Sequence, residues 1–274
     1  KGFFFDPISI YCLRKERSER MKSDQLLNVV GYAGKLLIES GAEIYRVEET
    51  MVRLCHSFHE VQDAESFVTP TGIMLSITVD GKTSTKIMRV HSRGVDLNCI
   101  DRINALSRRA SETAFSLEEL NQQLQEIGRK ERYSFGMTLL FSALSAGGFA
   151  IFFQGSMLEA GCAFFIGLII KAITWFMEQR DLNNFFINAI GAAFAAMVAL
   201  GLHKLLANTD VDIMIISSIM LLVPGLAITN AIRDTVAGDY LSGVARACEA
   251  FLVAIAIAVG IGFILSIFMV QGGV

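Results

Sequence analysis

The stretch LLVPGLAITNAIRDTVAGDY, residues 221 to 240, decides how this chain is interpreted. It begins like a membrane-spanning helix, but it contains Pro224-Gly225 and then Arg233-Asp234. Proline removes a backbone donor, and polar groups are costly to hold in hydrocarbon. A simple membrane anchor gains nothing from these residues, so the stretch favours a membrane protein that uses its spans for more than anchoring.

A broken helix followed by a polar face is expected in this stretch. The proline cannot donate to the carbonyl four residues back, and the glycine lets the backbone bend, so the helix should kink or unwind here. Asn230, Asp234 and Gly238 then recur every four residues, with Arg233 beside them. Irregular backbone at membrane depth is tolerated where protein shields it or where it lines a wet cavity. We interpret the stretch as part of a substrate path; the alternative is that Arg233 and Asp234 belong to an inner loop.

Composition divides the chain into two parts. Of its 274 residues, 53% are hydrophobic and 19% are charged, and the mean hydropathy of +0.48 is too high for an ordinary soluble domain of this size. The charged residues gather in the N-terminal half, whereas residues 135–274 are rich in Ala, Ile, Leu, Phe and Gly. We expect a cytoplasmic α+β domain at 21–132 and a transmembrane domain at 133–274. The net charge of −3 offers no basic field, so we predict no nucleic-acid partner.

Residues 1–20 differ from both parts. They lack the basic start, apolar centre and small-residue cleavage site of a secretory signal. The amphipathic pattern begins only after Met21, so we expect residues 1–20 to be an appended or poorly ordered lead.

The first part has the pattern of a small α+β domain. Apolar residues recur at helical spacing from 26 to 38, and Ser40-Gly41 marks a break. Ser40 and Glu43 have the spacing of a capping box, which predicts a second helix from about 41 to 60. The other predicted elements are a strand at 66–69, a β-hairpin around Asp80-Gly81, a helix near 96–113 and a helix near 117–130 that follows a Ser116-x-x-Glu119 capping box.

No residue pattern in this domain predicts a metal or another cofactor. Cys55, His56, His59 and Glu60 lie close together on one predicted helix and could share a metal ion. No matching cluster of ligands occurs elsewhere in the sequence, so we predict no metal site. The cysteines are scattered without a CxxC pair, which is typical of free thiols in a reducing cytoplasm.

Paired carboxylates are the feature that would make this domain a membrane-tethered hydrolase. Glu39, Glu43, Glu48 and Glu49 could serve acid-base chemistry. Capping explains Glu43, and a pair with Arg53 four residues on explains Glu49. Because the sequence also lacks a phosphate-binding loop, a nucleophile elbow and an HExxH motif, we predict that the chain is not an enzyme.

Five membrane spans are predicted, because a span needs about 20 apolar residues. They lie at about 135–153, 157–177, 185–206, 211–231 and 243–270. Lys171 lies about two turns from the inner end of its span, so snorkelling to the interface explains it at least as well as a substrate contact does.

Basic residues set the expected orientation. Arg129, Lys130 and Arg132 precede the first span and Arg180 lies between the second and third, whereas the opposite loops hold little beyond Lys204. An odd number of spans with a basic first flank puts the N-terminal domain in the cytoplasm and the C-terminus outside. The predicted fold is therefore an α-helical membrane protein of about five transmembrane helices, preceded by a small α+β cytoplasmic domain.

Three separated motifs resemble the threonine/serine exporter-like family of membrane proteins. They are VPG-x4-N-x3-D-x3-G-x4-G-x2-R (Val223 to Arg246), ESGAEIYRVEETM (Glu39 to Met51) and RVHSRGVDL (Arg89 to Leu97). By this resemblance the candidate substrate path carries Pro224, Gly225, Asn230, Asp234, Gly238, Gly243 and Arg246, and Arg233 lies within the same motif. The soluble-domain motif carries Gly41, Glu43, His91, Arg93 and Gly94.

The resemblance implies a bacterial inner-membrane exporter of small polar metabolites, above all threonine and serine, that is driven by the proton gradient. Full-length members of the family fuse a second membrane half, so a chain with about five spans resembles the split form, which a second small membrane subunit completes. One split pair of this type is associated with succinate export, which keeps a dicarboxylate substrate open. The expected partners are that second subunit, the small-molecule substrate and the lipid bilayer, with a homo-oligomer as a further possibility. A metabolite sensor is the remaining alternative to transport.

Overall fold

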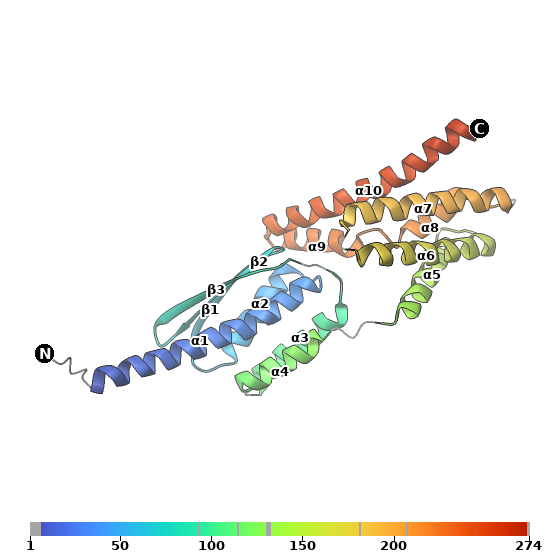
Figure 1. Cartoon of the computed structure of the whole chain (residues 1–274). Helices are drawn as coiled ribbons and strands as arrows, with labels where there is room; N and C mark the ends of the chain where they lie inside the picture. Colours follow the sequence, from blue (N-terminus) through green and yellow to red (C-terminus); the bar gives the residue numbers. More distant parts are fainter. Residues whose placement is uncertain are drawn as a thin grey trace. The chain divides into compact units, whose positions relative to one another are not determined.

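The structure, a computed structural model, describes residues 7–91, 94–113, 115–129, 133–180, 182–206 and 208–272. Contacts divide the chain into two units, whose elements are labelled in Figure 1. Unit 1 comprises Lys1–Lys130 and Thr229–Arg246, and unit 2 comprises Glu131–Ile228 and Ala247–Val274. Hydropathy placed residues 229–246 in the transmembrane part, whereas their contacts group them with the N-terminal unit.

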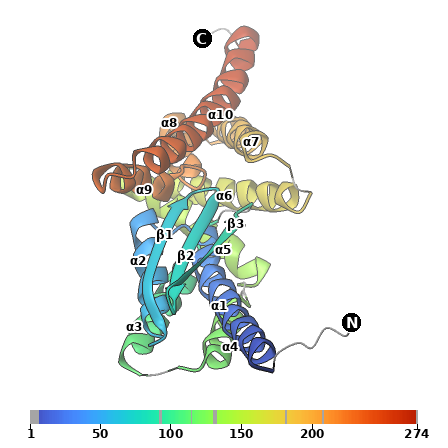
Figure 2. The same ribbon diagram turned by 90° about the vertical axis from the view of Figure 1, so that its left-hand side faces the viewer.

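The sheet of unit 1 is antiparallel, with the strand order β1-β2-β3 within the described residues. Its strands are β1 (Val61–Thr69), β2 (Gly72–Val79) and β3 (Lys82–Arg89), and Figure 2 shows them side by side. Asp80 and Gly81 join β2 to β3 with φ angles of 50° and 71°, a left-handed pair that suits a two-residue hairpin turn. The predicted hairpin is confirmed, and the strand predicted at 66–69 is the second half of the longer β1.

Helices cover this sheet in two layers. The helix α1 (Pro7–Glu39) packs on β2 and β3, and α2 (Ile44–His56) packs on β1. The helices α3 (Leu97–Glu112) and α4 (Leu117–Gly128) form the next layer against α1. Ile73, Leu75 and Ile77 of β2 are each at most 1% exposed and belong to the core of unit 1. Their alternation with more exposed neighbours is typical of a sheet buried on one face.

The helix bounds follow the local signals at α4 and differ from them at α1 and α2. The capping box of α4 is confirmed, because Glu119 N–H donates to Ser116 Oγ at 3.2 Å and Ser116 N–H donates to Glu119 Oε2 at 2.9 Å. The helix α1 begins at Pro7, inside the segment expected to be a lead, and residues 1–6 lie outside the described part. The helix α2 begins at Ile44 rather than near residue 41 and ends at His56 rather than near residue 60.

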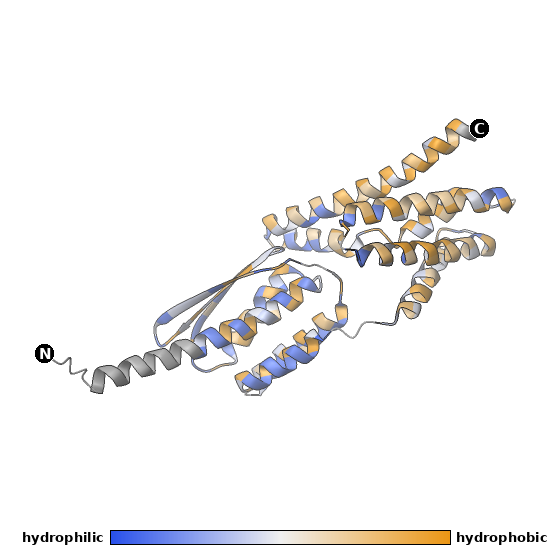
Figure 3. Ribbon diagram, in the orientation of Figure 1, coloured by the Kyte–Doolittle hydropathy of each residue, from blue (hydrophilic) through white to orange (hydrophobic). Residues whose placement is uncertain are grey.

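Unit 2 is built from apolar helices. Over the described residues, four helices are long and apolar enough to cross a membrane: α5 (Phe135–Phe152), α6 (Met157–Glu178), α7 (Asn184–Leu205) and α10 (Tyr240–Gly272). They match the predicted spans at 135–153, 157–177, 185–206 and 243–270. Figure 3 shows that hydrophobic residues dominate these four helices along most of their length.

The fourth predicted span, at 211–231, is not one helix. It is divided into α8 (Val211–Ile219) and α9 (Gly225–Val236), with irregular backbone between them. At 1.5 Å per residue, the nine residues of α8 reach only about 13 Å, less than half of a hydrocarbon core of about 30 Å. The predicted break at Pro224-Gly225 is confirmed, and it is complete rather than a kink.

The short helix α8 lies within protein rather than alone. It packs against α5, α6 and α7. Met214, Ser217 and Ser218 are fully buried, and the Ser218 hydroxyl donates to the Met214 carbonyl at 2.7 Å. A half-length helix with an unwound end is tolerated in a membrane where protein buries it or where it lines a wet cavity, and the contacts of α8 with three helices bury part of its surface.

Candidate functional site

The turn between α1 and α2 is where the three sequence motifs meet. It begins with a Schellman motif, in which Gly41 N–H donates to Ile38 O at 3.0 Å and Ala42 N–H donates to Leu37 O at 3.0 Å. Gly41 has a φ of 87°, a left-handed conformation that a side chain would strain. The task of Gly41 is therefore to end α1 and turn the chain towards α2.

The segment after β3 binds the first two carbonyls of this turn. Gly94 N–H donates to Glu39 O at 2.9 Å, and Asp96 N–H donates to Ser40 O at 3.0 Å. Gly94 therefore takes part through its backbone. Of the remaining residues of this motif, His91 is exposed and Arg93 lies outside the described residues.

The segment from 229 to 246 binds the next two carbonyls. Asn230 Nδ2 donates to Gly41 O at 2.7 Å, and Arg246 Nη2 donates to Ala42 O at 2.7 Å. Asn230 is 2% exposed and Arg246 is 8% exposed. Two side chains from distant sequence thus satisfy backbone acceptors that neither α1 nor α2 can satisfy.

The N-terminus of α2 is capped by Asp234. Ile44 N–H donates to Asp234 Oδ1 at 3.0 Å, and the Asp234 side chain is fully buried. A carboxylate at this end of a helix satisfies an orphan donor and interacts favourably with the helix dipole. This corrects the predicted Ser40–Glu43 capping box: Glu43 is the N-cap residue but makes no side-chain cap, and Ser40 Oγ is buried without a hydrogen-bond partner in the described structure. The pattern misled because Ser40 still belongs to the Schellman turn that ends α1.

Three ion pairs complete the arrangement. Asp234 Oδ2 lies 3.2 Å from Arg246 Nε, an ion pair without hydrogen-bond alignment. Glu43 pairs with Arg233 through Oε1 and with Arg46 Nε through Oε2 at 3.5 Å. The first pair is buried, whereas the Arg233 side chain is 54% exposed. We call Asn230, Arg233, Asp234 and Arg246 the clamp, because together they hold residues 41–44.

The two carboxyl groups of this site respond to their surroundings in opposite ways. Burial raises the pKa of Asp234 above the usual range, and the Ile44 N–H and the Arg246 charge offset only part of this effect. Burial also acts to raise the pKa of Glu43, but its own backbone N–H, Arg233 and Arg46 outweigh burial and lower the pKa. Asp234 is therefore harder to ionise, and Glu43 easier to ionise, than the same side chains exposed to water.

Two glycines of the membrane motif shape the junction between α9 and α10. Gly238 has a φ of 98° and ends α9 with a second Schellman motif, in which Asp239 N–H donates to Asp234 O at 2.8 Å. Gly243 lies so close to α9 that an added Cβ would overlap Thr235 Oγ1 and lie 3.0 Å from Ala231 O. These glycines keep Asp234 and Arg246 on neighbouring helices. Pro224 and Gly225, at the start of α9, belong to unit 2.

The glutamates considered for hydrolysis are engaged in structural contacts. Glu39 pairs with Lys35 at 3.8 Å, Glu49 pairs with Arg53 as predicted, and Glu48 Oε1 accepts a hydrogen bond from Val68 N–H at 2.8 Å. In the described part of the chain, no group of three or more His, Cys, Asp or Glu side chains could hold a metal ion. The contacts assign these carboxylates to holding helices and strands together.

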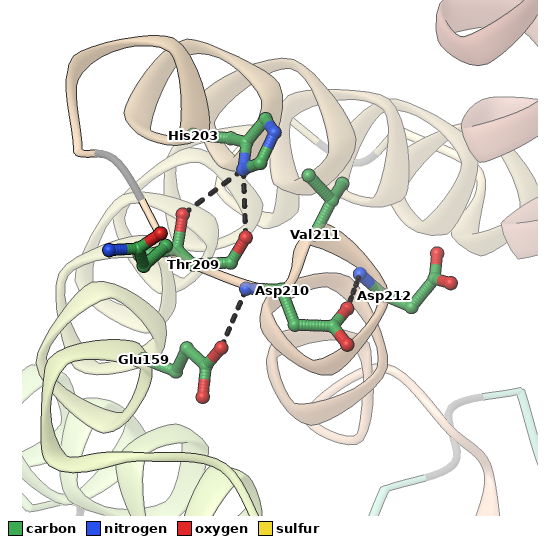
Figure 4. Close-up of a pocket in the computed structure, with 7 residues that line it drawn as sticks. Glu159, His203, Thr209, Asp210, Val211 and Asp212 are labelled. Atoms are coloured by element: carbon green, nitrogen blue, oxygen red, sulfur yellow. Dashed lines mark hydrogen bonds between the residues drawn. The ribbon is translucent and has the colours of Figure 1, made fainter.

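A second polar cluster lies in unit 2, where α7 is joined to α8 (Figure 4). Glu159 Oε1 accepts a hydrogen bond from Asp210 N–H at 2.6 Å, and its Oε2 accepts one from Ser156 N–H at 2.6 Å. His203 Nδ1 lies 2.8 Å from Thr209 O, so this nitrogen carries the proton. These side chains cap helices and fix the α7–α8 connection, and we assign them that structural task.

Some of the groups that the clamp contacts, or that pair with Glu43, were not predicted from the sequence. Arg46 lies three residues after Glu43, a spacing that could have signalled its pairing. Ala42 O and Ile44 N–H take part through the backbone, for which no side chain gives a signal.

Comparison with known proteins identifies the family. The model of the family described as "Putative threonine/serine exporter" matches residues 28–268. The chain belongs to this family. It is a multi-pass membrane protein of a transporter family. No solved structure matches the chain.

Two kinds of relative within the exporter family differ in length. The "Probable succinate transporter subunit YjjP" of Escherichia coli (strain K12) is 28% identical over 244 residues, which cover 88% of this chain and 94% of that protein. The "Threonine/serine exporter" of Corynebacterium glutamicum is 24% identical over 245 residues, which cover 86% of this chain and 50% of that protein. The "Probable threonine/serine exporter" of Mycobacterium tuberculosis is 22% identical over 262 residues, which cover 93% of this chain and 49% of that protein. The match thus spans about half the length of the threonine/serine exporters and nearly all of the transporter subunit.

Proposed function

We propose that this chain is a subunit of a bacterial inner-membrane exporter that moves small polar metabolites, first of all threonine- and serine-type amino acids. The observation that carries the proposal is the division of one predicted span into α8 and α9. Many transporters bind substrate beside discontinuous helices, because unwound backbone offers polar groups at membrane depth. Membership of an exporter family supports the same conclusion.

The clamp supports a role for α9 in transport. Its first residues, 225–228, directly follow the break, and its later residues Asn230, Arg233 and Asp234 hold the turn between α1 and α2. A movement of the broken segment must therefore strain or release the clamp through one short helix. We propose that residues 224–246 are the moving part of the exporter and that the N-terminal unit restrains it.

The orientation follows from the basic residues. We propose that the N-terminal unit lies in the cytoplasm and the C-terminus outside, because Arg129 precedes α5 and Arg180 separates α6 from α7. In this orientation, metabolites made inside the cell can reach the N-terminal unit and the clamp.

A second small membrane subunit is the proposed partner. The relative that this chain matches over nearly its whole length is called a transporter subunit, and the threonine/serine exporters are about twice as long as the match. A separate subunit would correspond to the unmatched half of those exporters, with assembly of further copies of this chain as an alternative. The same relative makes succinate the second candidate substrate.

Efflux from intact cells tests the proposed function. Cells that carry the gene together with its proposed partner should release labelled serine or threonine, or succinate, faster than cells without the gene. The control variant Asp24→Asn, an exposed carboxylate of α1, should release them at the wild-type rate. Equal efflux from cells with and without the gene would contradict the proposal, and binding without flux would favour a sensor.

A further inference from the structure

Unit 2 contains a polar cavity of about 310 Å³ at the end where α6 stops and α7 starts. Three helices contribute polar side chains to its wall, and the segment after α8 contributes two leucines. The polar side chains of the wall include Thr138 and Ser142 of α5, Lys171, Thr174 and Glu178 of α6, and Asn188 of α7. Small-molecule pockets commonly measure roughly 300–1,000 Å³, so this cavity suits a metabolite of amino-acid size.

Snorkelling of Lys171, considered above from the sequence, does not by itself explain the polar lining of the cavity. The Lys171 ammonium lies 3.8 Å from Glu178 Oε1, and its side chain is 25% exposed. Snorkelling explains why one lysine points towards a helix end. It does not explain why Ser142 and Asn188, on two other apolar helices, line the same space. Ionisable residues inside membrane helices are rare and mark binding sites and pathways, so Lys171 with these polar neighbours forms a candidate binding site.

The broken helix forms part of the cavity wall. Leu221 and Leu222, which lie between α8 and Pro224, border the cavity. Gly191 of α7 brings them close, since an added Cβ would lie 3.3 Å from Leu222 Cδ1 and 3.3 Å from Thr174 Cγ2. The cavity and the irregular segment are thus one feature, and a movement of the segment would reshape the cavity.

We propose that this cavity binds the exported metabolite as a zwitterion, with its carboxylate at Lys171 and its ammonium at Glu178. Among the described residues that line the cavity, these two are charged, one of each sign. The first turns of α7, with Asn184 and Asn188, also face the cavity, and a helix N-terminus favours a carboxylate. A dicarboxylate would bring a second negative charge towards Glu178, so the site selects against succinate. The assignment rests on the proposed function.

Transport into inside-out membrane vesicles tests the site, because uptake there corresponds to export. Vesicles would hold the full chain with the proposed second subunit, and the KM for labelled serine, threonine and succinate would be measured. Lys171→Gln should raise the KM for serine roughly tenfold or more, because a charge-assisted hydrogen bond is lost. Glu178→Gln should raise the KM for serine but not for succinate. The matched control Lys204→Gln, which removes a lysine that lies over the Phe268 ring, should stay within about twofold of wild type.

The outcomes separate this site from the proposed function. Wild-type vesicles without uptake of any of the three metabolites would contradict the proposed function, and the site would fall with it. Uptake that Lys171→Gln leaves unchanged in KM would overturn the site while the function stands. An unchanged KM for serine in Glu178→Gln would overturn the zwitterion assignment.

A labelling experiment covers the case in which Lys171→Gln does not fold. Asn188→Cys places a thiol in the cavity wall, and serine should slow its reaction with a small water-soluble methanethiosulfonate. The parent chain, in which Cys248 is exposed, reports the background labelling. Labelling of Asn188→Cys at the same rate with and without saturating serine would contradict binding in this cavity.

Discussion

At the scale of single residues, Asp234 makes the contact that links two of the sequence motifs. Its carboxylate caps α2, whose first residue is 190 positions away in the sequence. The charge is fully buried between the N-terminus of α2 and the Arg246 guanidinium. Desolvation of such a pair is costly, so the pair is weak support for stability, and we infer that its use here is to fix one geometry. The pair therefore specifies how α9 and α10 hold the turn before α2.

Asp234→Asn should destabilise the protein by about 3 kcal/mol, because the Arg246 charge would stay buried without its partner. Removal of both charges, in Asp234→Asn with Arg246→Met, should cost at least about 1 kcal/mol less than the sum of the two single variants. Free energies of unfolding in detergent, obtained from denaturant titrations, measure this coupling. The control Asp24→Asn should change the free energy of unfolding by less than about 0.5 kcal/mol. Additive single effects would contradict a coupled pair.

Glu43→Gln should destabilise the protein by roughly 1 kcal/mol at neutral pH, because the exposed Arg233 loses its partner. The pKa of Glu43 is lowered in the folded protein, so this contribution is fully present above the unfolded value of about 4.5. It is lost as the pH falls through the folded value, and the variant and wild type should then become equally stable. Unfolding measured from pH 7 to pH 3 checks the sign. A gap that widens in acid would contradict the assignment, and the exposed Glu65→Gln should show little gap at any pH.

The sequence predicted most residues of the site but not their shared task. Two motifs contained Gly41, Glu43, Asn230, Asp234 and Arg246, yet their meeting depends on backbone groups of residues 41–44. A pattern search cannot detect a carbonyl that needs a donor from another segment. The Ser40–Glu43 spacing misled because Ser40 belongs to the turn that ends α1, and the remote carboxylate of Asp234 caps α2 instead.

At the scale of elements, the division of one predicted span into α8 and α9 is the central feature. Pro224-Gly225 predicted the irregular backbone correctly, because a missing donor and a flexible residue act locally. The stretch 211–231 was expected to be one continuous helix because a hydropathy window measures composition and not the continuity of hydrogen bonds. Such a window cannot distinguish two short helices from one long helix.

Pro224→Ala should separate stability from transport. Alanine restores the missing donor and is about 3 kcal/mol more favourable than proline inside a helix, so α8 and α9 can join. Thermal stability should stay equal or rise, while export should fall because the irregular segment is lost. Melting temperature and efflux measured on the same preparation check both signs. Pro70→Ala, in the turn between β1 and β2, is the control, and wild-type efflux by Pro224→Ala would contradict a role for the break.

Gly243→Ala should force α9 and α10 apart. The added methyl group would overlap Thr235 and approach Ala231 O, which predicts a loss of about 1–3 kcal/mol. Gly262→Ala in the same helix meets nothing within 4 Å and should be neutral or slightly stabilising. Thermal unfolding of the two variants makes the comparison, and equal melting temperatures would contradict the close approach at Gly243.

At the scale of the whole molecule, the chain does not divide at one point along the sequence. Composition separated a charged N-terminal half from an apolar C-terminal half, and the α+β elements and four long apolar helices agree with that separation. Residues 229–246 nevertheless group with the N-terminal unit. The mixed polarity of this segment, inside an apolar half of the chain, does not indicate from sequence that it groups with the N-terminal unit. Its contacts with residues 41–44 explain why it is polar.

The central claim is that this chain exports a small metabolite together with a second subunit and that the clamp is required. Efflux of labelled serine, threonine and succinate from proteoliposomes, with and without the second subunit, tests it most directly. We expect flux of at least one of the three that requires both chains and is lost in Asp234→Asn, with serine or threonine preferred to succinate. Absence of flux for all three, with both chains inserted and bound to each other, would contradict the claim.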